Sequence, residues 1–340
     1  MNVALDMQLA LGTATGIGEY ASGLAAALRD SGVHVTELSE PKLDPWRFDR
    51  RVAWDQVVLP QRARTSGADV LHCTSGTMPM RAGMPTVVTV HDVAWLKVQH
   101  HTRPYARYYF GAFALQRYKR ADAVIVDSAF SKDELLGVGA IDPAKIEIVF
   151  PGVASDYCAL TLQEPQPFVL VPGTVEARKN LAVLIRALPH LPGVRIVSTG
   201  PFTPYRDECE ALARDLGVSD RIDFRGYVSR DALLQLYASC SLVAVPSRYE
   251  GFGYAAAQAL CAGVPVIAAR TSSLPEVVDG AAPLVDPEDE SVWASAMQAV
   301  LHDPQSARER AQAVKANAQS RFSWQASADA AIRVYARAIA

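Results

Sequence analysis

Residues 247–258 combine a carboxylate, several glycines and the start of a predicted helix. Glu250 and Gly251–Gly253 follow an apolar run, 241–246, that predicts a buried strand, and the alanine-rich stretch 254–262 predicts a helix. Where a strand turns through glycines into a helix, unpaired backbone N–H groups at the positive end of the helix dipole bind phosphate. The Glu250 carboxylate then accepts hydrogen bonds from a sugar next to that phosphate. The alternative is an ordinary turn with a solvated glutamate.

A pair of adjacent cations follows another predicted strand. Arg178 and Lys179 come shortly after Gly173, which closes the apolar run 168–171. Two cations beside a glycine turn can hold a diphosphate and stabilise its charge as it leaves. The alternative is an exposed basic pair at a helix start. The helix dipole disfavours cations there unless an anion binds, which favours the functional interpretation.

A histidine and a glycine-rich loop lie at the ends of two further predicted strands. His91 follows the apolar run 86–90, and the carboxyl ends of parallel strands are where α/β folds bind their ligands. Either His91 faces a ligand, or it caps the strand and bonds a neighbouring carbonyl. Gly16 and Gly18 allow a ligand to approach the backbone closely. Gly23 comes too late to complete a dinucleotide fingerprint, which argues against a nicotinamide dehydrogenase.

Short apolar runs alternate with longer helical patterns along the whole chain, which predicts parallel sheets built from βαβ units. Most runs are continuous Val, Ile and Leu, as expected for strands that are covered on both faces. The predicted strands are 2–7, 33–38, 69–73, 86–90, 123–127, 146–149, 168–171, 195–198, 221–224, 242–245, 265–268 and 282–285.

These strands form two sets of six, so we expect an α/β chain with two Rossmann-like domains. The first predicted domain is 1–153 and the second is 168–322. Between them, 154–167 contains two prolines and several polar residues, which predicts a linker. The segment 323–340 spaces apolar residues along one helical face and predicts a C-terminal helix that packs back on the first domain.

Composition narrows the class of protein. The chain has 340 residues, half of them apolar and a fifth charged, and its net charge of -3 argues against nucleic-acid binding. The five cysteines are scattered without a C-x-x-C pair, so we expect neither a metal site nor a disulfide framework. The chain begins with a predicted strand and not a signal peptide, and no apolar run is long enough to span a bilayer. These features predict a cytoplasmic protein.

One segment departs from the otherwise balanced charge. Residues 93–121 contain six Lys and Arg, no Asp or Glu, and interleaved Tyr and Phe. Such a segment suits a surface that meets a phosphorylated acceptor or an anionic membrane, the latter as peripheral contact of residues 97–120 with the inner face of the plasma membrane. The alternative is a helix with aromatic side chains in the core and basic groups in solvent.

Taken together, these segments resemble the retaining GT-B glycosyltransferases of family 4, a group that includes bacterial mannosyltransferases. The resemblance covers essentially the whole chain, and the order and spacing of its motifs make the set specific. The form of 173–180 is most similar to the branch that uses GDP-mannose or related GDP-sugars for surface polysaccharides. The motifs are 12–18, 89–92, 127–132, 151–153, 173–180, 224–228 and 247–253.

The resemblance implies a GT-B fold, with two Rossmann-like parallel-sheet domains facing a cleft, of which 1–153 would bind the acceptor and 168–322 the nucleotide sugar. It also implies a role for each motif. His91 would contact the donor sugar, Arg178 and Lys179 would neutralise the diphosphate, and Glu250 would bind the sugar. Residues 226–228 would line the base pocket. The other implied donor-binding residues are Gly16, Gly18, Gly173, Thr174, Gly226, Tyr227, Val228, Ser247, Gly251, Phe252, Gly253 and Gln258.

Position 258 departs from the family pattern. The family has a second glutamate eight residues after the first, which binds the ribose hydroxyls, whereas this chain has Gln258. A carboxylate accepts from two hydroxyls at once, while an amide offers one acceptor and one donor group. We expect the loss of a charge-assisted bond to weaken donor binding by roughly 1–2 kcal/mol, with activity retained.

The combined prediction is a retaining hexosyltransferase that moves mannose or a 6-deoxyhexose from a GDP-sugar to a saccharide or polyprenyl-linked saccharide in surface polysaccharide synthesis. No carboxylate is obviously placed to attack, so the leaving diphosphate would take the acceptor's proton. Protein cations would stabilise it, so no metal or other cofactor is required. Two alternatives stay open: a non-hydrolysing sugar-nucleotide epimerase with the same fold, and a non-catalytic glycosyltransferase-like assembly subunit.

Overall fold

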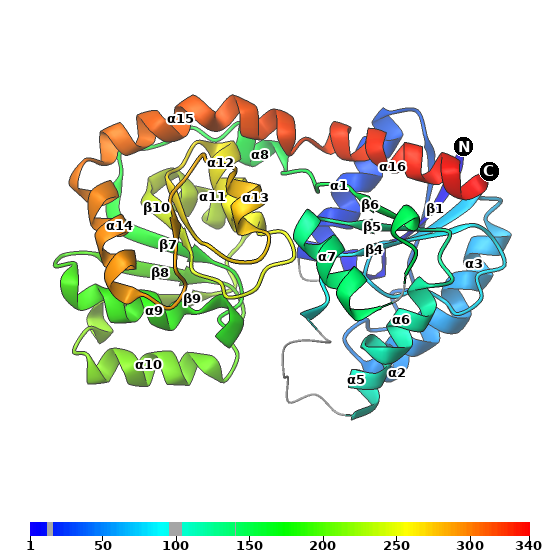
Figure 1. The fold of residues 1–340 in the computed structure, drawn as a ribbon, viewed down its shortest axis with the longest axis horizontal. Coiled ribbons are helices and arrows are strands. Elements are labelled where there is room, and N and C mark those ends of the chain that lie inside the picture. The colour runs from blue at the N-terminus through cyan, green and yellow to red at the C-terminus, as the bar shows by residue number, and fades with distance from the viewer. Residues whose placement is uncertain (12–15, 95–103, 140) are drawn as a thin grey trace. The chain divides into compact units, whose positions relative to one another are not determined.

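Two parallel sheets of six strands each dominate the computed structural model, which describes residues 1–11, 16–94, 104–139 and 141–340 (Figure 1). The chain divides into two compact units, Met1–Gly152 together with Phe322–Ala340, and Val153–Arg321. All twelve predicted strands are present within two residues of their predicted ends. The α/β architecture with two parallel sheets is therefore confirmed.

The first unit contains a sheet with the strand order β2-β1-β3-β4-β5-β6. Its strands are β1 (Asn2–Asp6), β2 (His34–Leu38), β3 (Val70–Cys73), β4 (Thr86–Val90), β5 (Ala123–Val126) and β6 (Ile146–Ile148). Its helices are α1 (Gly16–Asp30), α2 (Phe48–Ala53), a π-helical turn (Trp54–Val58), α3 (Leu59–Thr65), α5 (Pro104–Phe110), α6 (Ala112–Tyr118), α7 (Ala129–Val138) and α16 (Trp324–Ile339).

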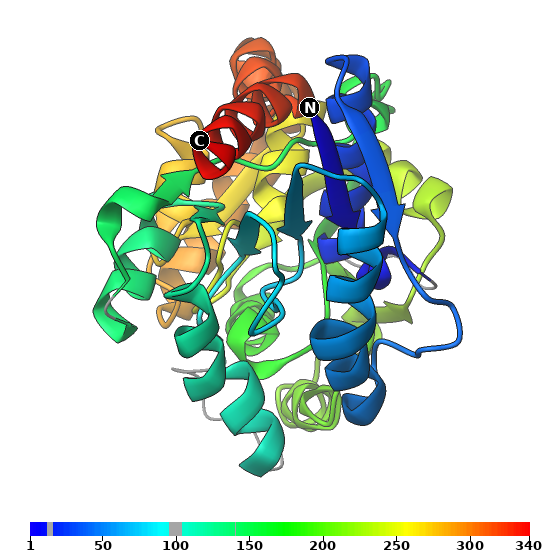
Figure 2. The same cartoon turned by 90° about the vertical axis from the view of Figure 1, so that its right-hand side faces the viewer.

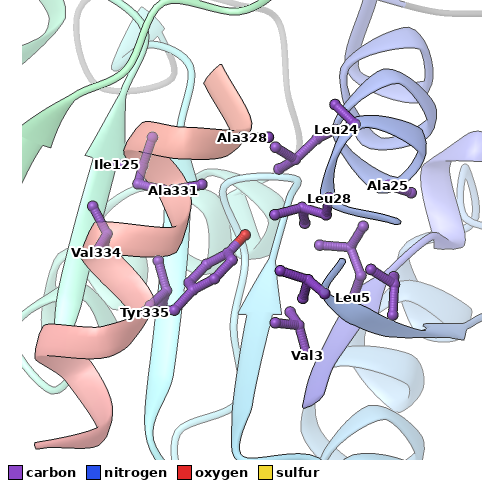
Figure 3. Close-up of a cluster of buried hydrophobic side chains, with 14 of the residues drawn as sticks. Val3, Leu5, Leu24, Ala25, Leu28, Ile125, Ala328, Ala331, Val334 and Tyr335 are labelled. Carbon is purple, nitrogen blue, oxygen red and sulfur yellow. The ribbon is translucent and has the colours of Figure 1, made fainter. Parts of the chain in front are cut away.

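Helices cover both faces of this sheet, because its strands are apolar on both sides. Val3 and Leu5 of β1 join a core cluster with α1 and α16, whereas Ala4 joins a second cluster on the other face. In Figure 2, α16 lies on the opposite side of the strands from α5 and α6. The C-terminal helix is therefore an integral layer of the first unit, and its apolar side chains face those of α1 (Figure 3).

The second unit contains a sheet with the order β12-β11-β10-β7-β8-β9. Its strands are β7 (Gln166–Pro172), β8 (Arg195–Thr199), β9 (Ile222–Gly226), β10 (Cys240–Val245), β11 (Val266–Ala269) and β12 (Leu284–Val285). Its helices are α8 (Ser155–Cys158), α9 (Leu181–Ala187), α10 (Tyr205–Asp215), α11 (Arg230–Ser239), α12 (Tyr254–Ala262), α13 (Leu274–Val278), α14 (Glu290–His302) and α15 (Pro304–Arg321). Because β7 and β10 are neighbours, the loops that follow them meet at one edge of the sheet.

The segment 154–167 is not a free linker. It includes α8 and the start of β7, and both belong to the second unit. The Tyr157 side chain of α8 is fully buried, with its ring 5.1 Å from that of Tyr237 in α11. Burial of such a large aromatic side chain ties the segment to the second unit, which the two prolines and polar residues of the sequence do not reveal.

The basic, aromatic segment 93–121 agrees completely with neither of its two predicted interpretations. Tyr105 and Tyr108 of α5 are 45% and 62% exposed, so some aromatic side chains lie outside the core. Arg117 is fully buried instead, with its guanidinium 4.3 Å from the centre of the Tyr109 ring. Burial beneath an aromatic face removes this cation from any surface. Part of the segment, 97–103, lies outside the described residues, as does Gly12 of the glycine-rich loop.

None of the described helices combines the length and the apolar character that crossing a bilayer requires.

Candidate active site

The loops after β7 and β10 bring three of the predicted charged residues together. Arg178 and Lys179 end a short 3₁₀ turn (Ala177–Lys179) that follows β7, and Glu250 follows β10. The 3₁₀ turn stops because Asn180 adopts a left-handed conformation with φ 55°, from which α9 begins. The buried Asn180 side chain donates to the carbonyl of Pro287 over 2.6 Å, which anchors the turn in the second unit.

Glu250 is the centre of this cluster. Lys179 Nζ lies 2.6 Å from its Oε1 and Arg178 Nη1 lies 3.3 Å from its Oε2. The Ser247 hydroxyl also donates to Oε1 over 2.6 Å. Arg178 makes a second ion pair with Glu176, at 2.8 Å. The two cations are thus held by carboxylates of the protein.

Glu250 is ionised although it is buried. Its residue is only 6% exposed, so the predicted alternative of a solvated glutamate is wrong. Burial raises the pKa of the Glu250 carboxyl, but the charges of Lys179 and Arg178 and the hydrogen bonds from Lys179 and Ser247 outweigh burial, and the pKa is lowered overall. The sequence argument that these cations wait for an external anion also needs correction, because Glu250 already supplies one.

Two serines that sequence reasoning missed hold the backbone around Glu250. Its N–H donates to Ser272 Oγ over 3.0 Å. The Ser273 hydroxyl lies 3.0 Å from the carbonyl oxygen of Glu250 and 2.7 Å from that of Phe252. Both serines come shortly after β11, so their position at the carboxyl end of a strand was the signal available in the sequence.

A small pocket lies beside this cluster, and several of the predicted donor-binding residues line it. Its wall includes Gly173, Thr174, Lys179, Ser247 and Glu250. The structure therefore brings residues from two separate sequence motifs to one place, at the carboxyl ends of β7 and β10. This is the edge at which parallel α/β sheets bind ligands.

The glycine turn after Glu250 opens α12. Gly251 and Phe252 are buried, and Gly253 stands before the first residue of the helix with φ 101°. A residue with a side chain would be strained in this conformation, so the turn into α12 favours glycine. Gly253 also lies close to Leu274, because a Cβ atom added there would come 2.7 Å from Leu274 Cδ2.

The predicted base-pocket residues lie at the end of the edge strand β9. Gly226 is the last residue of that strand, Tyr227 is 56% exposed, and Val228 is partly buried. The Gly226 carbonyl accepts from the N–H of Gly200 over 2.6 Å. Gly200 was missed by sequence reasoning. It has φ 111°, and a Cβ atom there would lie 2.4 Å from the Gly173 oxygen, so only glycine permits these two loops to approach.

Gln258 is buried in α12, with 7% of its surface exposed. Its Oε1 accepts a hydrogen bond from the Tyr237 hydroxyl over 3.1 Å. With its oxygen bonded to Tyr237, the group that Gln258 retains for a ligand is its amide N–H₂.

The first unit holds the remaining predicted residues. Gly16 and Gly18 lie in the first turn of α1, and His91 directly follows β4. His91 Nδ1 lies 2.6 Å from Asp127 Oδ2, and Nε2 lies 2.9 Å from the Thr74 carbonyl oxygen. Of the two predicted interpretations, the bond to a neighbouring carbonyl is therefore present.

Both His91 nitrogens face oxygen atoms that can accept, which favours the imidazolium, the form of the ring that donates from each nitrogen. Burial lowers the pKa of His91, but the charge and hydrogen bond of Asp127 and the Thr74 carbonyl outweigh it, so the pKa is raised. Sequence reasoning did not assign a role to Asp127. Its signal was its place directly after β5, the strand next to β4.

Comparison with known proteins matches nearly the whole chain to two families. Residues 14–157 match the family described as Glycosyltransferase Family 4, and residues 159–321 match Glycosyl transferases group 1. Among curated proteins, the chain is 34% identical over 281 residues to a D-inositol 3-phosphate glycosyltransferase of Mycobacteroides abscessus, covering 76% of this chain and 62% of that protein. It is 34% identical over 235 residues to the Mycolicibacterium smegmatis protein of the same name, covering 64% and 54%. The matched regions thus span less than two thirds of these relatives.

Solved structures show the same fold at low sequence identity. Sucrose-phosphate synthase from Thermosynechococcus elongatus superposes with a TM-score of 0.78 at 23% identity, covering 99% of this chain and 98% of that one. Anabaena HepE, solved in complex with UDP and glucose, superposes with a TM-score of 0.76 at 19% identity, covering 99% of both chains.

Proposed function

The chain belongs to the glycosyltransferases of group 1 and family 4 and has the GT-B fold, and from this premise we propose that it transfers a sugar from a nucleoside diphosphate sugar to an acceptor hydroxyl. The observation that carries the proposal is the convergence of Arg178 and Lys179 on the buried carboxylate of Glu250. Two cations fixed beside a pocket form a preorganised site for a diphosphate.

The proposed role of the cations is to stabilise the leaving diphosphate. Their side chains are each 23% exposed, so an anion can reach them without unfolding the loop. Because Glu250 already holds them in place, little reorganisation is needed when charge develops on the leaving group. Arg178 and Lys179 then neutralise the diphosphate charge that a metal ion would otherwise neutralise, so the proposed reaction needs no metal.

Glu250 would exchange partners during binding. In the free protein it neutralises the two cations, and a bound diphosphate would take over that role. The carboxylate would then accept hydrogen bonds from the hydroxyls of the transferred sugar, with its backbone still fixed by Ser272 and Ser273. This exchange couples recognition of the sugar to recognition of the diphosphate, because one carboxylate takes part in both.

We propose that transfer proceeds with retention of configuration. The leaving diphosphate oxygen would accept the acceptor's proton as the acceptor oxygen bonds to the anomeric carbon on the same face. His91 would act at the donor sugar as an imidazolium. Its fixed positive charge supports a role in electrostatic stabilisation, whereas a base must be able to accept a proton.

The identity of donor and acceptor is the finer part of the proposal. The sequence of 173–180 supports a GDP-hexose donor, mannose or a 6-deoxyhexose, with a saccharide or polyprenyl-linked saccharide as acceptor. The curated relatives, whose name refers to D-inositol 3-phosphate, support a phosphorylated cyclitol as a second acceptor class. A phosphorylated acceptor would require its own cationic contacts, so the two classes are separated by assay with each acceptor.

Peripheral membrane contact stays a proposal for the surface of α5. Tyr105 and Tyr108 are exposed there, while the buried Arg117 takes no part. Aromatic side chains and nearby basic groups suit the interface of an anionic bilayer. Sedimentation with phosphatidylserine vesicles tests the contact, which should weaken as salt rises. Binding that is insensitive to salt would contradict it.

A thermal-shift screen tests the proposed activity. GDP, UDP, ADP and dTDP and their sugars are added singly, with the matching monophosphates as controls. A ligand that binds the native state raises the melting temperature by mass action, so the correct diphosphate should do so and its monophosphate much less. Protein and the selected donor are then incubated with and without acceptors, and products are analysed by mass spectrometry.

The same experiment separates the alternatives. A sugar transferred to an acceptor supports the proposal, and rearrangement of the donor without acceptor would identify an epimerase. Failure of every diphosphate to stabilise the protein would favour the non-catalytic subunit.

A further inference from the structure

The start of α16 is locked into the first unit by two glycines. Trp324, its first residue, lies so close to α1 that a Cβ atom on Gly23 would come 2.2 Å from its indole ring. A Cβ atom on Gly152 would come 2.3 Å from the same ring. Close packing against the Trp324 indole therefore requires glycine at position 23, and this requirement is independent of any dinucleotide-binding pattern. The Tyr20 ring packs on the same indole at 6.0 Å.

Near the other end of α16, a chain of buried hydrogen bonds begins. The Tyr335 hydroxyl lies 2.7 Å from His72 Nδ1, and His72 Nε2 lies 2.8 Å from Thr89 Oγ1. Thr89 Oγ1 lies 2.9 Å from the Tyr20 hydroxyl. These four side chains are 0–1% exposed, so no solvent competes for their hydrogen bonds. The chain links α16, β3, β4 and α1.

The hydrogen-bond chain is satisfied by a neutral histidine, which donates from one ring nitrogen and accepts at the other. Burial, reinforced by the charge of His91, lowers the pKa of His72 to about 3, so the ring is neutral and has one N–H and one acceptor nitrogen. Tyr335 can donate to the acceptor nitrogen while the other nitrogen donates to Thr89. Each end of the ring then has a hydroxyl partner, which fixes the ring plane.

The chain ends beside His91. The Tyr20 ring meets the His91 ring edge-on, with centroids 4.8 Å apart and an interplanar angle of 83°. Tyr20 also lies one helical turn after Gly16, so its hydrogen bond to Thr89 ties the beginning of α1 to β4. The same hydroxyl chain therefore reaches both parts of the candidate site that lie in the first unit.

We propose that Tyr335 and His72 are positioning residues, which act through Thr89 and Tyr20 to hold the His91 ring and the start of α1 in register. The C-terminal helix thereby sets the geometry of a site that it does not itself touch. The expected effect on turnover rests on the proposed glycosyl transfer, whereas the positioning itself can be tested without any substrate.

The first test is NMR of the full chain labelled with ¹⁵N-histidine, with signals assigned by single His→Gln variants. Tyr335→Phe removes one hydroxyl and keeps the ring, so we expect the His72 signals to move and the His91 signals to move with them. Ser327→Ala is the matched control. It removes a buried hydroxyl on the same helix that donates to the Phe150 carbonyl, outside the chain of bonds. It should leave both histidines unchanged.

Two NMR outcomes would overturn the proposal. In one, Tyr335→Phe moves His72 alone. In the other, Ser327→Ala moves His91 as much as Tyr335→Phe does, so that general docking of α16 is responsible. If Tyr335→Phe fails to fold, Thr89→Val and Thr89→Ser replace it. Valine removes the hydroxyl and serine retains it, so only valine should shift His91, and equal shifts would contradict the proposal.

Turnover provides the second test once a donor is known. Tyr335→Phe should lower kcat on the order of tenfold, because a small displacement of reacting groups is costly. Donor KM should stay within about twofold, because the second unit still binds the diphosphate. Thr89→Ser should retain the rate that Thr89→Val loses, and an unchanged kcat in Tyr335→Phe would count against positioning. If His91 responds in NMR but no donor is ever turned over, the proposed function fails and the positioning stands.

Discussion

The two polar clusters of this protein are built in opposite ways. The second-unit cluster places Arg178, Lys179 and Glu250 on loops, with both cations 23% exposed. The first-unit cluster places His91 against a fully buried chain that ends at Tyr335. Partly exposed charges can exchange an internal partner for a ligand, whereas buried neutral bonds persist. The comparison indicates that the second-unit cluster is suited to binding a charged ligand, whereas the first-unit cluster is suited to fixing the position of His91.

The energetic consequences differ in the same way. Removing the charge of Glu250 leaves two cations that are each 23% exposed and that water can still solvate, so stability changes little and binding changes much. Removing one partner from a fully buried chain leaves the other without a hydrogen bond, which costs about 1–3 kcal/mol. Variants in the two clusters should therefore separate loss of binding from loss of order.

The largest effect is expected from Arg178→Met combined with Lys179→Met. Without either cation, diphosphate binding and leaving-group stabilisation are both lost, and kcat/KM for transfer should fall at least about 10³-fold. Arg248→Met is the control, because this nearby arginine pairs with Glu288 and not with Glu250. Measurement of transfer and of melting temperature together checks the claim. Near-normal transfer by the folded double variant would remove the basis of the comparison.

Glu250→Gln should separate the two tasks of that carboxylate. The amide keeps the size but loses the charge, so sugar transfer should fall about 10²-fold. The free nucleoside diphosphate should bind more tightly than to the unaltered protein, because Lys179 loses the Glu250 charge and Arg178 keeps only its ion pair with Glu176. Calorimetry with the diphosphate and with its sugar measures both quantities. Weaker binding of the free diphosphate would show that Glu250 organises the cations and does not compete with the ligand.

The sequence revealed the second-unit cluster because its residues directly follow strands. Continuous Val, Ile and Leu runs identified β7 and β10, and Arg178 and Glu250 stand on the loops after them. Their pairing across 72 positions then follows from the adjacency of those strands. What the sequence could not show is that Glu250 is buried and already paired, since this depends on how closely the two loops pack.

The first-unit cluster was largely hidden from the sequence. His72 and Tyr335 are 263 positions apart, and the helical pattern of α16 marks Tyr335 only as a core residue. The helical spacing of apolar residues shows which side chains face the core, but it does not show whether a core tyrosine also donates a hydrogen bond. The roles of Gly23 and Gly200 could not be predicted from the sequence either. Gly23 packs against the Trp324 indole and Gly200 against the Gly173 carbonyl, and both partners come from distant segments.

Gln258→Glu tests whether residue 258 of the second unit contributes to binding of the donor. A carboxylate at this position can accept from two ribose hydroxyls, so donor KM should fall about tenfold. The free protein should melt at a lower temperature, because the new charge would be buried with only the Tyr237 hydroxyl as its known partner. Kinetics and thermal melting check both parts. An unchanged KM would place the ribose away from residue 258.

The smallest expected effect concerns the pH dependence contributed by two histidines of the first unit, His91 and His72. The pKa of His91 is raised when folded, so its contribution to stability is fully present below about pH 6.5 and is lost as pH rises through the folded pKa. The pKa of His72 is lowered to about 3, so its contribution is present above about 6.5 and is lost as pH falls toward 3. Of His91 and His72, only His91 still titrates above pH 6.5.

The melting temperature of the unaltered protein should therefore decline relative to His91→Gln as pH rises from 6.5, by on the order of 2 °C, equivalent to roughly 1 kcal/mol. Asp127→Asn should abolish the same decline, since the neutral amide no longer favours the imidazolium. Melting curves at fixed ionic strength measure the difference. Parallel curves for the unaltered protein and His91→Gln would mean that His91 is neutral in the folded state, and the hydrogen-bond chain from Tyr335 to Tyr20 would then end at an uncharged ring.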